Sequence, residues 1–352
     1  MLVPTSALKV HSKRHLIELT PCNTVPIHRQ IRSLASLSVG AYDELKDDPM
    51  FSYFVYGFDR LGRKERHDAG SYGNGPAHEY AHTLVSDLFD IQQIESAIMA
   101  SLVLNVWMFV IHHLYEFLRS CQNHDRSGML QALDIAAALW IGTMDTPEAQ
   151  ERGGYSLYHL AQAVQTHFKH SNSDAPRGES HANHLFVTTL QSFQAQAKTP
   201  GMCEEEESFV QFRSLVHQAI GYATIPLVQL LVNEVMQTED GSPATDVAVY
   251  GFTIAPRLAI CNPIYFGRFY QKFVREQFQV SEKKLNIERL QSIYSCLEVS
   301  CVHVGSYRKA GMPSCIDDNK DATAPVIVGY QTHSSQVRPV RCSSCLAHYG
   351  SM

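Results

Sequence analysis

The chain has 352 residues, 45% of them hydrophobic and 18% charged, which is the composition of a globular protein that can bury a core. A net charge of −6 argues against general nucleic-acid binding, since that function needs a positive surface to displace counterions from the phosphates. With 16 Tyr and 16 Phe, disorder is not expected over most of the chain.

The sequence as given predicts neither a signal peptide nor a transmembrane segment. Its first residues include Lys9, Lys13 and Arg14 but lack the apolar run of about 7–15 residues that a signal peptide needs. The most apolar stretch, Ile98–Leu118, contains two histidines and a glutamate, which are too polar for a span of roughly 20 residues in hydrocarbon. We expect that stretch to be a buried helix.

Apolar residues recur at helical spacing along most of the chain, and glycine and proline clusters separate the helices that this spacing predicts. An irregular segment covers 1–24, a first helical half 25–121, a second half 128–305 and a loosely ordered tail 306–352. The expected fold is all-α, a bundle of about ten helices, with two packed bundles meeting near 122–128 as one arrangement. The predicted helices cover 25–48, 77–89, 91–121, 129–142, 155–170, 180–197, 206–238, 244–261, 263–278 and 285–299.

The sharpest local motif is HEYAH at 78–82, a literal H-E-x-x-H. On a helix His78 and His82 share one face and can bind one Zn²⁺, with Glu79 as the base toward a metal-bound water. Two features count against a hydrolase. A Gly-Pro pair places the motif in the first turn of its helix, and Glu95 is the only obvious acidic candidate for a third ligand shortly downstream.

A second candidate lies on the long apolar helix predicted for 91–121. His112 and Glu116 are one helical turn apart, so they could chelate a metal ion or form a hydrogen-bonded pair. The alternative is a buried histidine whose ring nitrogens bond to neighbours, which is the commoner fate of His on an apolar helix.

A third group consists of histidines on two neighbouring predicted helices, and antiparallel packing of those helices would bring their imidazoles together. Its members are His159, His167, His170, His181 and His184. Imidazole suits Zn, Cu, Fe or Ni, so such a cluster would not identify its metal. The alternative is a set of solvated surface side chains.

The nine cysteines fit several disulfides in an exported protein or buried thiols in a cytosolic one. Cys296 and Cys301 could form a short disulfide at the end of the helix predicted for 285–299. Cys342 and Cys345 form a CxxC, but a structural zinc site needs four ligands.

Several stretches form a recognisable series when taken in order. They are VWMFVIHHLYEFLRSC at 106–121, ALDIAAALWIG at 132–142, GGYSLYHLAQAVQTHF at 153–168, ATIPLVQLL at 223–231, GFTIAPRLAICN at 251–262 and LQSIYSCLEVSCVHVG at 290–305. This series resembles the low-iron-inducible periplasmic proteins of algae, the Fea-type iron-assimilation family. The resemblance implies an exported protein of the periplasm or cell surface, associated with iron acquisition, and implies no reaction. The sequence departs from the family at His113 and Ile135, where glutamate is expected, and at His159, where a small residue is expected.

The leading hypothesis is a non-catalytic, iron-responsive protein of the exported type that associates with iron or another divalent ion. A metal ion is the expected partner, with zinc as the other metal considered, and no nucleic acid is expected; the sequence does not identify protein partners. A zinc-dependent hydrolase with Glu79 as base is a second hypothesis, and a ligand-free helical scaffold is a third. The candidate metal ligands are His78, His82, His112, Glu116 and His159.

Overall fold

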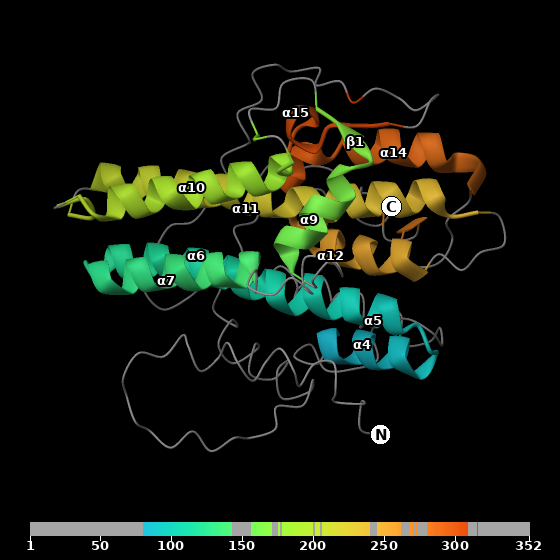
Figure 1. The fold of residues 1–352 in the computed structure, drawn as a ribbon, viewed down its shortest axis with the longest axis horizontal. Coiled ribbons are helices and arrows are strands. Elements are labelled where there is room, and N and C mark those ends of the chain that lie inside the picture. The colour runs from blue at the N-terminus through green and yellow to red at the C-terminus, as the bar shows by residue number, and fades with distance from the viewer. Residues whose placement is uncertain are drawn as a thin grey trace, which may run out of the picture.

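About 80% of the described part of the chain is helical and almost none of it is strand, which confirms the all-α, multi-helix prediction (Figure 1). The predicted helix 25–48, most of 263–278 and most of the tail lie outside the described residues. This computed structural model describes residues 80–142, 156–170, 175–176, 178–199, 201–204, 206–239, 245–261, 268–269, 272–273, 280–308 and 315.

The described elements follow the predicted order closely. They are α4 (Tyr80–Asp90), α5 (Ile94–Ser101), the π-helix η2 (Leu102–Val106), α6 (Trp107–Gln122), α7 (Arg126–Ile141), α9 (Leu157–Gln165), β1 (Phe168–Lys169), α10 (His181–Ala197), α11 (Glu206–Gln237), α12 (Thr245–Cys261), the 3₁₀-helix η3 (Val280–Glu282), α14 (Lys283–Gln291), the 3₁₀-helix η4 (Tyr294–Leu297), α15 (Cys301–Val304) and β2 (Ser306–Tyr307).

Short polar side chains fix the first turns of several helices. The Asp125 carboxylate accepts a hydrogen bond from the Gly128 N–H at 2.9 Å at the start of α7. The Ser180 hydroxyl accepts one from the Asn183 N–H at 3.1 Å at the start of α10. Each bond satisfies one of the backbone donors that the first turn of a helix leaves without a partner.

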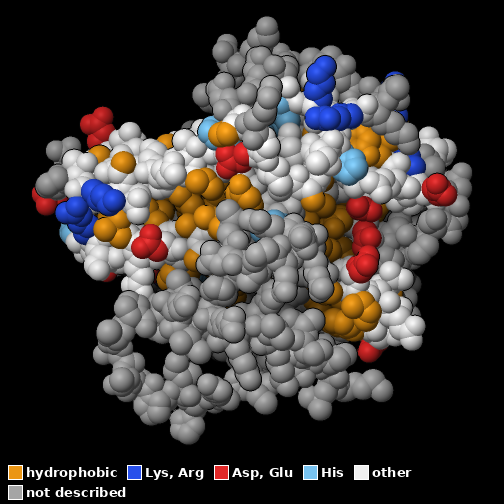
Figure 2. Space-filling model, viewed as in Figure 1, with side chains coloured by type: hydrophobic (Ala, Val, Ile, Leu, Met, Phe, Trp, Pro, Cys, Tyr) orange, Lys and Arg blue, Asp and Glu red, His pale blue; other side chains and the backbone are white. Residues whose placement is uncertain are grey.

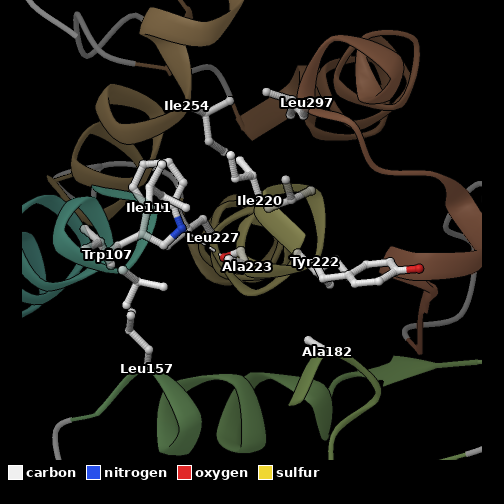
Figure 3. Packing of buried hydrophobic residues seen from close by; sticks show 14 of the residues in the cluster. Trp107, Ile111, Leu157, Ala182, Ile220, Tyr222, Ala223, Leu227, Ile254 and Leu297 are labelled. Atoms are coloured by element: carbon white, nitrogen blue, oxygen red, sulfur yellow. Dashed lines mark hydrogen bonds between the residues drawn. The ribbon is translucent and has the colours of Figure 1, made fainter. Parts of the chain in front are cut away.

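Helix α11 lies at the centre of the molecule, and helices from both ends of the described chain pack around it. Figure 3 shows Trp107 of α6, Leu157 of α9, Ile254 of α12 and Leu297 of η4 arranged around this helix. All four side chains are at most 1% exposed. Burial of each aliphatic or aromatic side chain of this kind stabilises the fold by about 1.5–3 kcal/mol.

Helix α6 runs antiparallel to α11. The Trp107 indole Nε1, at the start of α6, donates a 3.0 Å hydrogen bond to the Ala223 carbonyl in the middle of α11. Near the end of α6, the Phe117 ring contacts Phe212 near the start of α11, with centroids 5.1 Å apart. Later residues of α6 therefore contact earlier residues of α11, as in an antiparallel pair.

The polar break predicted between two halves is a tight turn between packed helices. Helices α6 and α7 lie side by side (Figure 1). Buried apolar side chains from before and after 122–128 belong to the same core cluster. The arrangement as two bundles stays a prediction.

Two helical stretches, 94–122 and 207–237, are long and apolar enough to cross a membrane by length and composition. In the fold, 56% and 83% of their most apolar windows are buried against other elements. The second stretch is the central helix α11, and burial of a core helix accounts for such a composition.

Two predicted helices extend further than the observed ones. The helix predicted for 155–170 ends at Gln165, and Phe168 and Lys169 form a short antiparallel pair with Tyr307 and Ser306. The helix predicted for 285–299 ends at Gln291 and is followed by η4. In both cases the helix ends before a segment whose contacts are with residues distant in sequence.

Candidate metal site

The HEYAH motif is not tested by the fold. His78 and Glu79 lie outside the described residues. His82 belongs to α4 by its backbone, but its side chain is outside the described part. The zinc-hydrolase hypothesis therefore stays a prediction.

The pair predicted on the long helix is present on one face of α6. His112 Nε2 lies 3.9 Å from Glu116 Oε1. The Glu116 carboxylate is also paired with the guanidinium of Arg119, and this ion pair competes with any metal ion for the carboxylate. His112 is 8% exposed, and its ring lies 5.0 Å from that of His113. Burial, and secondarily the neighbouring His112, lower the pKa of His113 to about 4.

His159 has a local role at the start of α9. Its Nδ1 lies 2.7 Å from the Ser156 hydroxyl oxygen, and the same oxygen accepts a hydrogen bond from the His159 N–H at 3.2 Å. Ser156 is the N-cap of this helix. The ring is thus bonded within its own helical turn.

The third histidine group is brought together in part. His170, which directly follows β1, and His181, the first residue of α10, have ring centroids 4.7 Å apart. His167 instead stacks on the Tyr307 ring at 6.3 Å, and His184 Nδ1 lies 3.7 Å from Glu179 Oε2. Each of the two i,i+3 pairs therefore contributes one member to this contact, and the other member of each pair lies with a different partner.

His303 joins His170 and His181, and we call these three residues the histidine cluster. Its charge acts on the pKa of His170, and its ring contacts the Tyr222 ring of α11 at 5.2 Å. His303 is on α15, more than a hundred residues after the other two. Apart from the abundance of histidine, no sequence pattern points to this third member.

Two elements converge to form the cluster. The Gln162 side chain of α9 accepts a hydrogen bond from the Ser180 N–H at 2.9 Å, which holds the start of α10, and so His181, against α9. On the other side, β1, which ends next to His170, pairs with β2, which follows α15, so this pair holds His170 beside α15. Arg308 strengthens this junction by donating from Nε to the Phe168 carbonyl at 2.8 Å.

Both ring nitrogens of His170 face oxygen atoms. Nδ1 lies 3.3 Å from the Val302 carbonyl oxygen and Nε2 lies 3.1 Å from Gln165 Oε1. Burial lowers the pKa of His170, the Val302 carbonyl opposes that shift, and the charges of Arg308 and His303 add to it. The neutral imidazole, which is the form that binds metals, is therefore favoured at neutral pH.

Gly305 allows this ring to sit where it does. A Cβ atom at this position would lie 2.8 Å from His170 Nε2, closer than packed atoms approach. Its φ of +80° is also in the left-handed region that favours glycine. The residue type at 305 is thus fixed by both the ring and the backbone.

Among the described residues, no group of three His, Cys, Asp or Glu side chains lies close enough to hold a metal ion in the present arrangement. The histidine cluster therefore offers two adjacent imidazoles, with a third nearby. The donors fit a borderline transition metal rather than calcium or magnesium, which prefer oxygen ligands.

A buried polar network lies in the core and was not predicted. Arg257 Nη1 donates to the Thr224 hydroxyl at 2.8 Å, while its Nη2 pairs with the Glu298 carboxylate. His217 Nδ1 lies 3.3 Å from the other carboxylate oxygen of Glu298. Burial raises the pKa of Glu298, but the hydrogen bond from His217 and the charge of Arg257 outweigh it, so the pKa lies below its usual value. The one feature of the sequence that could have indicated this network is Arg257 itself, because an arginine within an apolar helical pattern needs a buried partner.

Disulfides join segments distant in sequence. Cys121 bonds to Cys203 and Cys301 bonds to Cys315, and Cys296 is also in a disulfide. The prediction that Cys296 pairs with Cys301 is wrong. Cys301 is the first residue of α15, and its Cα lies 5.2 Å from that of Cys315, within the range a disulfide spans.

Acidic and basic side chains are interspersed over the described part of the face shown in Figure 2. Comparison of the chain with models of protein families, with curated proteins and with solved structures finds no match.

Proposed function

We propose that this is an exported, non-catalytic helical protein that binds a divalent transition-metal ion, with iron as the first candidate, at the histidine cluster. The observation that carries the proposal is the 4.7 Å approach of the His170 and His181 rings from separate elements. Iron is the first candidate because of the family resemblance, since imidazole ligands alone do not discriminate among Fe, Zn, Cu and Ni.

The environment of His170 supports metal binding. Burial keeps its ring neutral, so a metal ion has little competition from protons near pH 7. The amide oxygen of Gln165 is a neutral partner that a metal at Nε2 would displace at modest cost. Tyr222 and the β1–β2 junction hold His303 close by as a further ligand.

The small number of imidazoles suggests what kind of site this is. A structural zinc site is closed by four protein ligands, whereas two or three leave positions for water or another ligand. Binding would be weak enough for the ion to exchange. Such a site suits transient association with a metal better than permanent stabilisation of the fold.

The disulfides support export. Disulfides persist in oxidising compartments such as the periplasm or the extracellular space, and they are rare in the cytosol. Here they link the end of α6 to the segment before α11, across 82 residues, and α15 to Cys315. A periplasmic or cell-surface location is therefore part of the proposal.

The test is isothermal titration of the metal-free, oxidised protein with Zn²⁺ and, under anaerobic conditions, with Fe²⁺. We expect one equivalent to bind with a Kd near about 1–10 μM, and His170→Ala to weaken binding at least about tenfold. His124→Asn is the matched control, because His124 is exposed and Asn tolerates its φ of +56°.

Two results would contradict the proposal: no saturable binding, or an equal loss in the His124→Asn control. Either would leave the ligand-free scaffold as the better description. A circular dichroism spectrum of each variant establishes that a lost affinity does not reflect an unfolded protein.

A further inference from the structure

A second candidate site, with different chemistry, lies beside α14. Residues 268–269 and 272–273, which are helical, and α14 enclose a pocket of ≈ 350 Å³. This volume falls within the range of about 300–1,000 Å³ typical of small-molecule sites. Within the described part of the chain, none of the predicted metal ligands lines it.

One wall of the pocket is apolar. Phe269 and Phe273 are 5% and 3% exposed, and their ring centroids lie 4.6 Å apart. Leu290 and Ile293, also buried, line the same space from the other side. The wall can cover a flat or aliphatic body of a few carbons and remove its surface from water.

The rim carries an excess of positive charge. Arg268, Lys272 and Arg289 line the pocket, against Glu288 as the one acidic residue that does so in the described part of the chain. Lys272 is already paired, since its Nζ lies 2.6 Å from Glu282 Oε2. The two arginines, both exposed, are therefore the cations best placed to receive an anion.

A buried amide donor points to a ligand independently of the rim. Asn286 lines the pocket and is 0% exposed, and its Oδ1 accepts from Arg289 Nη1 at 3.4 Å. Its Nδ2 is buried without a hydrogen-bond acceptor among the described residues. A buried donor without an acceptor is unfavourable, and an acceptor atom brought by a ligand would satisfy it.

We propose that this pocket binds a small organic carboxylate with an aromatic or aliphatic body. The body lies against Phe269 and Phe273, and the carboxylate pairs with Arg268 and Arg289 and accepts from Asn286. A carboxylate fits better than a phosphate because much of the lining is apolar and Glu288 would repel a doubly charged group. The site goes beyond metal binding and does not depend on it.

The experiment is isothermal titration of the full oxidised chain, kept metal-free with a chelator, with 4-phenylbutyrate and with the neutral 4-phenylbutan-1-ol. We expect the carboxylate to bind with a Kd below about 1 mM and the alcohol at least about tenfold more weakly. Arg289→Gln should weaken the carboxylate about tenfold and leave the alcohol unchanged, since a hydrogen bond to a charged group is lost. Lys284→Gln is the control, because Lys284 is an exposed cation of α14 that does not line the pocket.

Equal affinity for acid and alcohol, no binding of the acid at about 1 mM, or an equal loss in Lys284→Gln would each overturn the proposal. Arg268→Gln provides a second test, because Arg268 does not contact Asn286 and its change leaves that amide in place. Since chelator is present throughout, failure here leaves the metal proposal standing, and failure of the metal proposal leaves this one standing.

Discussion

Arg257 and Glu298 form an ion pair in the protein interior, with Nη2 3.1 Å from Oε2 and side chains 4% and 6% exposed. Glu298 adopts a φ of +57°, in the left-handed region that favours glycine. Gly221 of α11 lies directly beneath it, since a Cβ there would come within 2.3 Å of the Glu298 carbonyl oxygen. The pair and this contact together fix the segment between η4 and α15 against the central helix.

Arg257→Met should lower the free energy of unfolding by about 3–5 kcal/mol, because it leaves the buried Glu298 carboxylate without its cation. Urea denaturation at pH 7 measures this change. Arg119→Met, which removes an exposed arginine paired with Glu116, should change stability by no more than about 1 kcal/mol. Equal losses of unfolding free energy in the two variants would show that the interior pair contributes no more to stability than the exposed one.

Stability should fall as the pH drops from 6.5 toward 4, in part because of His113. Burial lowers the pKa of this ring from its usual 6.5 to about 4, so in that window the unfolded chain binds a proton that the folded chain does not. His113→Gln should flatten the pH dependence of the free energy of unfolding by about 1–3 kcal/mol across the window. Urea denaturation at several pH values tests this, with His124→Asn expected to keep the wild-type slope.

Gly305→Ala should perturb the histidine cluster, whereas Gly178→Ala should not. Both glycines have positive φ, at +80° and +92°, so each alanine carries the backbone cost of about 1–2 kcal/mol. Only at 305 would the new methyl group meet His170, because nothing lies within 4 Å of a Cβ at 178. The NMR shifts of the His170 ring and the Zn²⁺ affinity should change in the first variant alone. Matching behaviour of the two would mean that the ring is not held by this contact.

Replacement of Cys121 and Cys203 together by serine should destabilise the protein by about 4–5 kcal/mol, since their bond closes a long loop in the unfolded chain. The shorter loop closed by Cys301 and Cys315 should be worth about 3 kcal/mol. Thermal melts of the two double variants, and of wild type with and without reductant, measure both. A larger loss for the shorter loop would contradict this order.

The sequence predicted helix bounds well where they depend on local features, namely apolar periodicity and N-cap residues. Helices α10 and α11 begin and end within a residue or two of the predicted bounds, because Ser180 caps the first and a long apolar pattern marks the second. The π-turn at 102–106 could not be predicted, since its five residues have the same apolar composition as the helices on either side. The helix predicted for 285–299 ends early, at Gln291, and the chain then continues through η4 to Glu298. The partners of Glu298 are His217 of α11 and Arg257 of α12, and no local pattern encodes these contacts.

The same limit applies to the candidate site. The spacing predicts that His170 lies near His181 across a short loop, but His170 follows β1 and is not on the helix predicted for 155–170. The contribution of His303 depends on the pairing of Phe168 with Tyr307 across 139 residues, and no local pattern encodes it. The disulfide partner of Cys301 was missed for a similar reason, because spacing favoured the nearer Cys296.

The central place of α11 has a consequence for biosynthesis. The helices from α4 to α10 leave the ribosome before residues 206–237, so the part of their apolar surface that packs on α11 stays uncovered until that segment has been made. The first half of the chain should therefore stay loosely folded and chaperone-bound during synthesis. If the protein is exported as proposed, this delay would keep the chain extended until it has crossed the membrane and can close its disulfides.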